Sequence, residues 1–337
     1  MCGIIGAYSL SGKNVVEDIF WGLKDLEHRG QEGCGLACPI SNEVISKRAW
    51  GSVDNLRSQV EGLVSPIAVG HTRYSTTGSS SAFGNLQPII PAHHCSALAH
   101  NGNLVNPKAL RKILKDIGID VSGYGSTDSG LIAAYIHDEG SGIRDKIRKA
   151  LTNEYFVGAF SLVIATRTKL IAVRDPWGIR PLSVGRVGDM MIVSSETCAF
   201  RESGAEFLFD VLPGEMITFK DGEILREQVV EPKKQSFCIF EAIYFARPDS
   251  CLYGNQVSSL RKRLGEEAAK AFSEKISIDD IDIISAVPDS GTFAALGFAN
   301  ALNASSKFDI SLLKVRGQRT FINPDSTLRR RGVREKL

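Results

Sequence analysis

Hydrophobic and polar positions divide the chain into a long mixed region and a shorter alternating one. In segment 14–28, Val15, Ile19, Leu23 and Leu26 recur at helical spacing, and Asn14 can cap the helix. The segments that follow alternate between strand-like apolar runs and helical patterns. Strands are expected at 36–38, 67–73 and 97–101, and helices at 107–117, 127–137 and 142–153.

From Val157 the pattern becomes that of β-structure, with apolar runs separated by turn dipeptides. Helices between two sets of β-segments predict a layered domain with antiparallel sheets. The polar segment 231–235 is typical of a domain boundary.

Beyond this boundary, helices and apolar runs alternate. A helix is expected at 258–272, an apolar run at 281–287, a helix at 292–302 and a second apolar run at 310–315. This order predicts a parallel sheet. Two parallel strands leave an edge and a face uncovered, so we expect either further chain or a partner that covers them, or a homo-oligomer.

Composition narrows the classes of partner. The 337 residues carry a formal net charge of +2, which gives no reason to expect nucleic acid. No apolar run approaches the ~18–20 residues of a membrane span, and no signal peptide is visible. Seven scattered cysteines favour reduced thiols and a cytoplasmic location. Cys34 and Cys38 lack a second ligand pair, so no metal site is expected there.

The first six residues, Met1-Cys2-Gly3-Ile4-Ile5-Gly6, contain the strongest candidate for chemistry. If Met1 is removed, the thiol of Cys2 stands beside a free α-amine. An α-amine titrates near pH ~8 and can act as a general base for that thiol. The alternative is an ordinary buried strand in which the cysteine is a small core residue. These six residues alone do not favour either hypothesis.

Two further segments supply groups that a thiolate attacking an amide needs. Arg73 ends an apolar strand and can bind a carboxylate bidentately, although a surface salt bridge is the commoner role. The Asn101 side chain and the Gly102 N–H are donors of the kind found in oxyanion holes, whereas Asn-Gly alone more often marks a tight turn.

Asp128 opens a helix after Ser126 and Thr127. Its carboxylate can face a substrate ammonium group, but capping at the helix N-terminus is its ordinary role. Each of these signals is weak when taken singly, and their order along the chain is much more specific.

The ordered motifs resemble those of class II glutamine amidotransferases, which are N-terminal-nucleophile hydrolases. The matching segments are 2–6, 26–31, 71–76, 100–104, 126–129, 174–182, 194–196 and 212–215. Segments 244–250, 287–291 and 319–322 extend the resemblance to the amidophosphoribosyltransferase family. The resemblance implies a four-layer αββα domain at 2–234, followed at 235–337 by an incomplete type I phosphoribosyltransferase-like α/β domain.

The resemblance also implies roles for individual residues. Cys2 would be the nucleophile, its α-amine the base, and Asn101 with Gly102 the oxyanion hole. Arg73 would bind the α-carboxylate of L-glutamine and Asp128 its α-amine. Arg29 would order the surroundings of the nucleophile, and Thr76 belongs to a small hydroxyl-rich loop that contacts glutamine.

The second half departs from the family pattern. A strand ending in two acidic residues and a phosphate-binding loop is expected after Ile322 and is not found in the 337 residues. Asp289-Ser290-Gly291 is more simply a turn with a cap. Magnesium with phosphoribosyl pyrophosphate (PRPP) is therefore expected only if this half is completed. Cys238 matches the first ligand of iron–sulfur members, but we expect a buried strand cysteine and no cluster.

Together these features predict an enzyme of purine synthesis that hydrolyses glutamine and passes ammonia to PRPP, giving 5-phosphoribosylamine. Three alternatives remain open at this point. The chain could be part of a longer protein, a glutaminase that supplies ammonia to a separate synthase, or a non-enzymatic regulatory paralogue.

Overall fold

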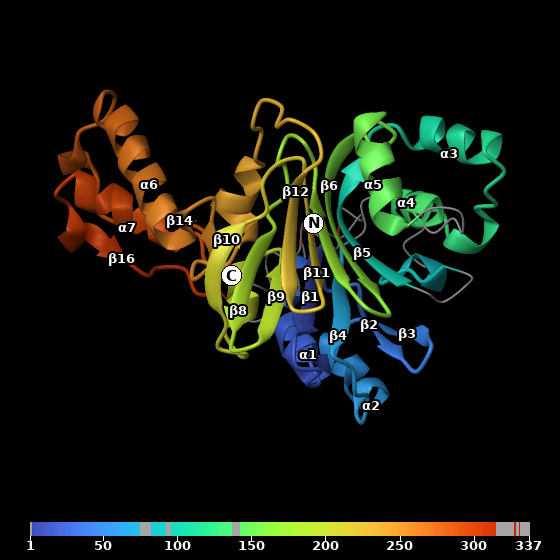
Figure 1. Ribbon diagram of the computed structural model, residues 1–337. Coiled ribbons are helices and arrows are strands. Elements are labelled where there is room, and N and C mark those ends of the chain that lie inside the picture. The colour runs from blue at the N-terminus through green and yellow to red at the C-terminus, as the bar shows by residue number, and fades with distance from the viewer. Residues whose placement is uncertain are drawn as a thin grey trace. The chain divides into compact units, whose positions relative to one another are not determined.

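The computed structural model describes residues 2–74, 82–91, 96–136 and 142–314, together with positions 327 and 330 (Figure 1). The chain divides into two compact units, Met1–Cys238 and Ile239–Leu337.

The first unit contains two mainly antiparallel sheets. The larger has the strand order β10-β8-β9-β1-β4-β2-β3, and the smaller has the order β12-β11-β7-β6-β5. The strands of the larger sheet are β1 (Gly3–Ser9), β2 (Gly33–Ile40), β3 (Glu43–Trp50), β4 (Ile67–Arg73), β8 (Ser183–Val187), β9 (Met190–Ser194) and β10 (Glu206–Asp210). Those of the smaller sheet are β5 (Ser96–Leu104), β6 (Gly158–Thr166), β7 (Leu170–Arg174), β11 (Glu215–Lys220) and β12 (Glu223–Gln228).

The two sheets pack face to face and are covered by helices on their outer sides. The interior between the sheets is formed by small and branched apolar side chains such as Ile4, Val69, Ala99 and Val163. Helix α1 (Val16–Asp25) packs on the larger sheet, with α2 (Arg57–Val60) beyond its edge. Helices α3 (Pro107–Asp116), α4 (Asp128–Ile136) and α5 (Ile143–Thr152) cover the smaller sheet.

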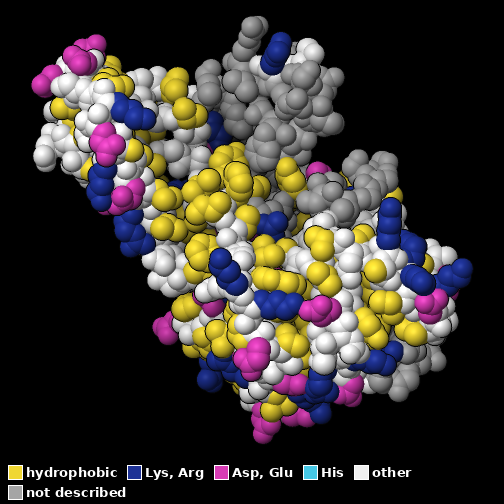
Figure 2. All heavy atoms as spheres, turned by 90° about the horizontal axis from the view of Figure 1, so that it is seen from above, with side chains coloured by type: hydrophobic (Ala, Val, Ile, Leu, Met, Phe, Trp, Pro, Cys, Tyr) yellow, Lys and Arg dark blue, Asp and Glu magenta, His cyan; other side chains and the backbone are white. Residues whose placement is uncertain are grey.

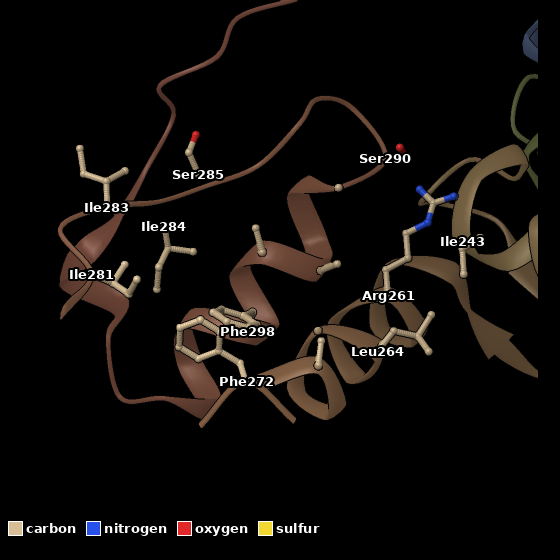
Figure 3. Close-up of a pocket in the computed structure, with 15 residues that line it drawn as sticks. Ile243, Arg261, Leu264, Phe272, Ile281, Ile283, Ile284, Ser285, Ser290 and Phe298 are labelled. Carbon is tan, nitrogen blue, oxygen red and sulfur yellow. The ribbon is translucent and has the colours of Figure 1, made fainter. Parts of the chain in front are cut away.

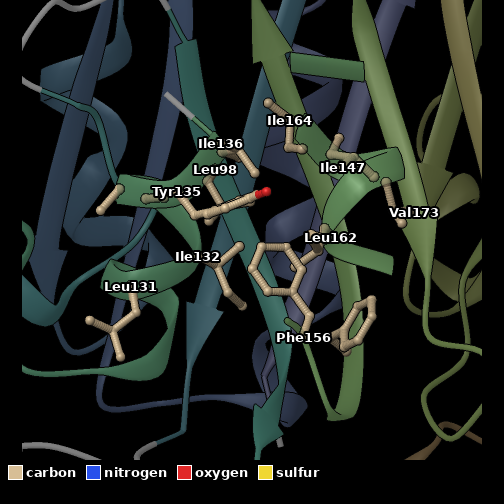
Figure 4. Close-up of a cluster of buried hydrophobic side chains, with 14 of the residues drawn as sticks. Leu98, Leu131, Ile132, Tyr135, Ile136, Ile147, Phe156, Leu162, Ile164 and Val173 are labelled. Atoms are coloured by element: carbon tan, nitrogen blue, oxygen red, sulfur yellow. The ribbon is translucent and has the colours of Figure 1, made fainter. Parts of the chain in front are cut away.

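The core under α4 and α5 shows why these helices lie where they do. Every residue of α4 is buried, and its apolar side chains meet those of β5, β6 and β7 (Figure 4). Tyr135 packs edge-on against Phe156, whose ring meets Phe160 on β6 in the same way. The sequence of layers is therefore helix, sheet, sheet, helix, which confirms the expected αββα domain.

Most predicted elements are present with small shifts at their ends. The segment 67–73 forms β4 as expected, and 97–101 is the middle of the longer β5. Strand β3 was not predicted, because charged and polar residues interrupt its alternation at the edge of the sheet. The Asn14 side chain accepts hydrogen bonds from Val16 N and Ser65 N, at 3.2 and 3.0 Å, where α1 begins.

The second unit is smaller and more open. It contains a π-helical turn at Glu241–Phe245, a hairpin of β13 (Cys251–Leu252) and β14 (Asn255–Gln256), helices α6 (Val257–Ser273) and α7 (Thr292–Ala301), and the parallel pair β15 (Ile284–Ser285) and β16 (Phe308–Asp309). The expected parallel pairing is present. However, both strands have only two residues, and the second lies before the apolar run at 310–315 rather than within it. Among the described residues no third strand lies beside this ladder.

The surface mixes charges of both signs. In the face shown in Figure 2, Lys and Arg side chains and Asp and Glu side chains are interspersed among apolar side chains. Among the described residues, no helix combines the length and the apolar character needed to cross a bilayer.

Candidate active site

One pocket of the first unit brings together most of the residues that the sequence singled out. Cys2, Arg73, Gly102 and Asp128 all line it. They come from the start of β1, the end of β4, the middle of β5 and the first residue of α4. The other lining residues are His71, Tyr74, Asn85, Gln87, His100, Thr127 and Ser129. Thr76 lies outside the described residues.

Cys2 directly precedes β1 and is half-buried. Its Sγ accepts a hydrogen bond from Tyr74 N at 3.5 Å and lies 3.5 Å from Tyr74 O. Two other thiols, those of Cys34 and Cys38 in β2, are fully buried. Burial raises the pKa of Cys34 to about 12 and that of Cys38 to about 11. Those two thiols therefore stay protonated at neutral pH, as expected of small core residues.

Arg29 orders the backbone next to Cys2 from a fully buried position. Its Nε donates to Cys2 O at 2.9 Å, and its guanidinium is paired with the carboxylate of Glu196. The same carboxylate accepts from His28 Nε2 at 2.9 Å. The sequence placed Arg29 near the nucleophile, but it did not identify Glu196 as the buried counter-charge.

His28, Glu196 and Cys198 also stand close enough together to be considered as metal ligands. The Glu196 carboxylate is already neutralised by Arg29, and its oxygens are occupied by Arg29, His28 and the Cys198 thiol. The cluster is therefore explained as the counter-charge of Arg29.

Arg73 is only 4% exposed, so the structure excludes an ordinary surface salt bridge. Its Nε lies 4.0 Å from Glu32 Oε2, and its guanidinium stands 5.7 Å from the centre of the Trp50 ring. A buried guanidinium that lines a pocket is suited to a ligand carboxylate.

Asn101 and Gly102 do not form a tight turn, because both lie within β5. Gly102 pairs with Phe160 on β6, and a Cβ on Gly102 would stand 2.0 Å from Ala159 O. The absence of a side chain is thus required by the close approach of the two strands. Asn101 is fully buried and is not among the residues that line the pocket, and its Nδ2 lies 3.5 Å from Ser195 Oγ.

Asp128 begins α4 but does not only cap that helix. Its Oδ2 accepts from Leu104 N at 2.8 Å, and its Oδ1 accepts from Ser129 N at 2.9 Å. Thr127 takes part of the capping role, because its Oγ1 accepts from Gly130 N at 3.3 Å. The buried Asp128 carboxylate lines the same pocket as Arg73, the last residue of β4.

A network of neutral polar groups forms the floor of the pocket. Gln87 Oε1 accepts from His100 N at 2.7 Å, and Ser129 Oγ lies 2.9 Å from His100 Nδ1. Burial lowers the pKa of His71 to about 3, with His100 and Arg73 adding to the effect. Burial also lowers the pKa of His100. Both imidazoles are therefore neutral at physiological pH. Sequence reasoning missed this network, and the only signal for it was the position of each histidine beside a predicted site residue.

The motif at 174–182 contacts the strand that pairs with Gly102. The buried Asp175 carboxylate accepts from the backbone N–H of Phe160, Trp177 and Ile179, and burial raises its pKa. Arg174 donates to three backbone carbonyls around the same loop. Phe160 is the ladder partner of Gly102, so this loop is connected to the proposed oxyanion donor.

The prediction that Cys238 is a buried strand cysteine was wrong. Cys238 is half-buried and lies in an irregular segment, where its N–H donates to Ile179 O at 3.2 Å. The segment 233–238 lies alongside the loop 176–179. Its backbone N–H groups donate to carbonyl groups of that loop and not to a strand of a sheet.

The second unit contains a pocket of a different kind (Figure 3). Most of its lining is apolar, from Ile281, Ile284, Phe272 and Phe298. The guanidinium of Arg261 is committed to backbone carbonyls, with Nε 2.8 Å from Ala242 O and a terminal nitrogen 2.9 Å from Ala246 O.

These lining residues do not fit magnesium with a polyphosphorylated sugar, which needs oxygen ligands and cationic donors. The Asp289 side chain nearby is paired with Lys314. The predicted motif at 319–322 lies outside the described residues.

Comparison with known proteins identifies the family to which the chain is similar. Residues 71–202 match the glutamine amidotransferase domain family. The amidophosphoribosyltransferase of Methanocaldococcus jannaschii is 39% identical over all of this chain and 74% of its own length. That of Bacillus subtilis is 36% identical over all of this chain and 69% of its own length. The fold and site thus define a glutamine amidotransferase of the N-terminal-nucleophile class.

The chain belongs to the amidophosphoribosyltransferase family of enzymes. A solved structure of the Bacillus subtilis glutamine PRPP amidotransferase, complexed with ADP and GMP, superimposes with a TM-score of 0.83 at 34% identity. The match covers 98% of this chain and 70% of that one. It therefore includes the αββα domain and the phosphoribosyltransferase-like unit.

Proposed function

We propose that the first unit hydrolyses glutamine with Cys2 as the nucleophile. The observation that carries the proposal is the single pocket in which a thiol, a buried guanidinium and a buried carboxylate converge. Arg73 binds the α-carboxylate of glutamine and Asp128 its α-ammonium group, so the side-chain amide is directed toward Cys2. Discrimination by two buried charges is strong, because a ligand lacking either partner leaves a charge unpaired.

The reaction proceeds in two steps. Removal of Met1 frees the α-amine of Cys2, which takes the thiol proton. The sulfur bonds to the amide carbon, and negative charge develops on the oxygen, where Gly102 N–H and the Asn101 amide donate hydrogen bonds. The C–N bond breaks as the amine returns the proton, and ammonia leaves. Water then cleaves the γ-glutamyl thioester to glutamate and restores the thiol.

We further propose that the ammonia is used to convert PRPP to 5-phosphoribosylamine in purine synthesis, the reaction indicated by the names of the relatives. The lining of the apolar pocket in the second unit does not fit PRPP and magnesium, so the residues that bind them would lie outside this pocket. A glutaminase that supplies a separate synthase is the second candidate, favoured by the apolar lining of that pocket.

Purified protein, with its N-terminus checked by mass spectrometry, tests these proposals. We expect release of glutamate from glutamine by the chain that begins with Cys2, and none by Cys2→Ala or by a chain that retains Met1. Hydrolysis by a chain that retains Met1 would contradict the role of the amine. Conversion of PRPP that depends on glutamine would support the transferase, whereas glutamate release with no effect of PRPP would favour the second candidate.

A further inference from the structure

The orientation of the Asn101 amide decides whether this residue can stabilise an oxyanion. The amide carries an acceptor oxygen on one side and a donor nitrogen on the other. Only the nitrogen can stabilise negative charge. A half-turn about the Cβ–Cγ bond exchanges the two groups without moving any carbon atom, so a neighbouring residue has to select the productive orientation.

Ser195 is the neighbour in contact with this amide. Its Oγ accepts a hydrogen bond from Ile4 N at 3.1 Å and lies 3.5 Å from Asn101 Nδ2. All three residues are fully buried. Within the part of the chain that the structure describes, these two contacts are the hydrogen-bonding neighbours of the hydroxyl. Its proton therefore has the Asn101 amide as its available acceptor.

The Asn101 oxygen gives the second observation. In the orientation with Nδ2 toward Ser195, Asn101 Oδ1 is buried and has no hydrogen-bond partner among the described residues. Ile4 N and Asn101 Nδ2 then both donate to Ser195 Oγ, the proton of that hydroxyl has no acceptor in the described part of the chain, and Asn101 Oδ1 has no donor there. In the exchanged orientation the Ser195 hydroxyl donates to Oδ1, and the amide nitrogen takes the position that lacks a partner. The hydroxyl proton and the amide oxygen then satisfy each other, and the amide nitrogen is left to donate to a ligand oxygen.

We propose that Ser195 is a positioning residue that holds the Asn101 amide with its nitrogen directed toward the developing oxyanion. Because Ser195 also accepts from Ile4 N, one hydroxyl joins the strand of the nucleophile to the strand of the oxyanion donors. Ser195 itself does not touch the substrate. This inference rests on the proposed glutaminase function and adds a residue to which the sequence resemblance assigned no role.

The chain offers a matched control in the preceding residue. Ser194 is also a fully buried serine and also contacts Ile4, because its Oγ donates to Ile4 O at 3.3 Å. It makes no contact with Asn101 among the hydrogen bonds of the described residues. Ser195→Ala and Ser194→Ala therefore remove the same group from adjacent positions, Ser194 at the end of β9 and Ser195 directly after it, and only the first releases the amide.

The test measures glutamine hydrolysis by the full chain in four variants: Ser195→Ala, Ser194→Ala, Asn101→Ala and the double variant at 101 and 195. Removal of an oxyanion donor typically lowers kcat ~10²–10³-fold. We expect Ser195→Ala to lower kcat at least ~10-fold with KM changed less than ~3-fold, since the donor acts in the transition state. Ser194→Ala should change kcat by less than ~3-fold. The double variant should be no slower than Asn101→Ala, because Ser195 acts only through that amide.

Alkylation of Cys2 by iodoacetamide provides a readout that a general structural defect would change. Sulfur displaces iodide from carbon in this reaction, and no oxyanion forms. We expect the alkylation rate of Ser195→Ala to match that of the unchanged protein. Equal slowing of alkylation and hydrolysis would overturn the proposal, as would full activity of Ser195→Ala or multiplicative losses in the double variant. If the unchanged chain hydrolyses no glutamine, the proposed function fails and this inference fails with it.

Discussion

At the scale of single residues, burial separates groups that can react from groups that only pack. Cys34 and Cys38 are locked in the protonated form by a pKa near 12 and 11, whereas Cys2 is half-buried at the pocket. Arg73 is buried in the lining of the same pocket, where its Nε lies 4.0 Å from Glu32 Oε2. The half-buried thiol and the buried guanidinium therefore share one pocket.

Arg73 permits a direct test of substrate binding. Truncation of one side of a buried charge pair typically costs ~2–5 kcal/mol, so Arg73→Ala should raise the KM for glutamine at least ~30-fold. Arg73→Lys, which keeps the charge but loses bidentate geometry, should show a smaller increase. Steady-state kinetics measure both variants. An unchanged KM for Arg73→Ala would show that another group binds the carboxylate.

At the scale of elements, the site depends on strands from opposite sheets meeting across the sandwich. Cys2 directly precedes β1, β5 supplies the Asn101-Gly102 pair, and Ser195 follows β9. Ser195 N donates to Ile4 O at 3.0 Å, while Ile4 N donates to Ser195 Oγ. Both the N–H and the C=O of Ile4, on the nucleophile strand, are therefore hydrogen-bonded to Ser195.

The close approach of β5 and β6 makes Gly102 a second element-scale test. A Cβ at this position would stand 2.0 Å from a backbone oxygen, so Gly102→Ala should separate the strands. We expect a loss of ~1–3 kcal/mol or more in the free energy of unfolding, together with loss of glutamine hydrolysis. Urea unfolding and the glutaminase assay measure the two effects. Gly123→Ala is the control, since a Cβ there meets no atom within 4 Å and should change neither quantity.

At the scale of the whole molecule, the two units differ in how complete their cores are. The first unit has three buried clusters, one between the sheets and one under each helical layer. The second has two small clusters and leaves apolar side chains around its pocket accessible. The first unit therefore buries most of its apolar side chains in its own core, whereas the second unit leaves apolar side chains exposed around its pocket.

The unfolding of the first unit should depend on pH through His71. Its folded pKa of about 3 lies below the ordinary value of 6.5, so between these values the unfolded chain binds the extra proton. Stability is therefore complete above pH 6.5 and falls as the pH decreases toward 3, by ~1.4 kcal/mol per pH unit.

Urea unfolding at pH 7 and pH 5, compared between the unchanged protein and His71→Asn, isolates this contribution. The unchanged protein should lose ~2 kcal/mol more than the variant over that interval. Equal losses would mean that His71 is not held neutral in the folded state.

The sequence by itself determined the family and the order of elements in the first unit, and it predicted four residues that line one pocket in the structure. Local patterns carry this information, since periodicity reports which face of an element is buried. The same reasoning missed β3, whose edge position removes the alternating signal, and misjudged Cys238, whose surroundings are a loop rather than a strand.

Only the tertiary structure decided how the site residues are held. Glu196 neutralises Arg29 from 167 positions away, and Ser195 meets Ile4 across 191. Contacts at such separations leave no periodic trace in the sequence, because they arise from which strands become neighbours when the sheets form and pack. Cys2, Arg29 and the segment 194–196 were therefore visible as motifs, while the pairing of Glu196 with Arg29 and of Ser195 with Ile4 became visible only through the fold.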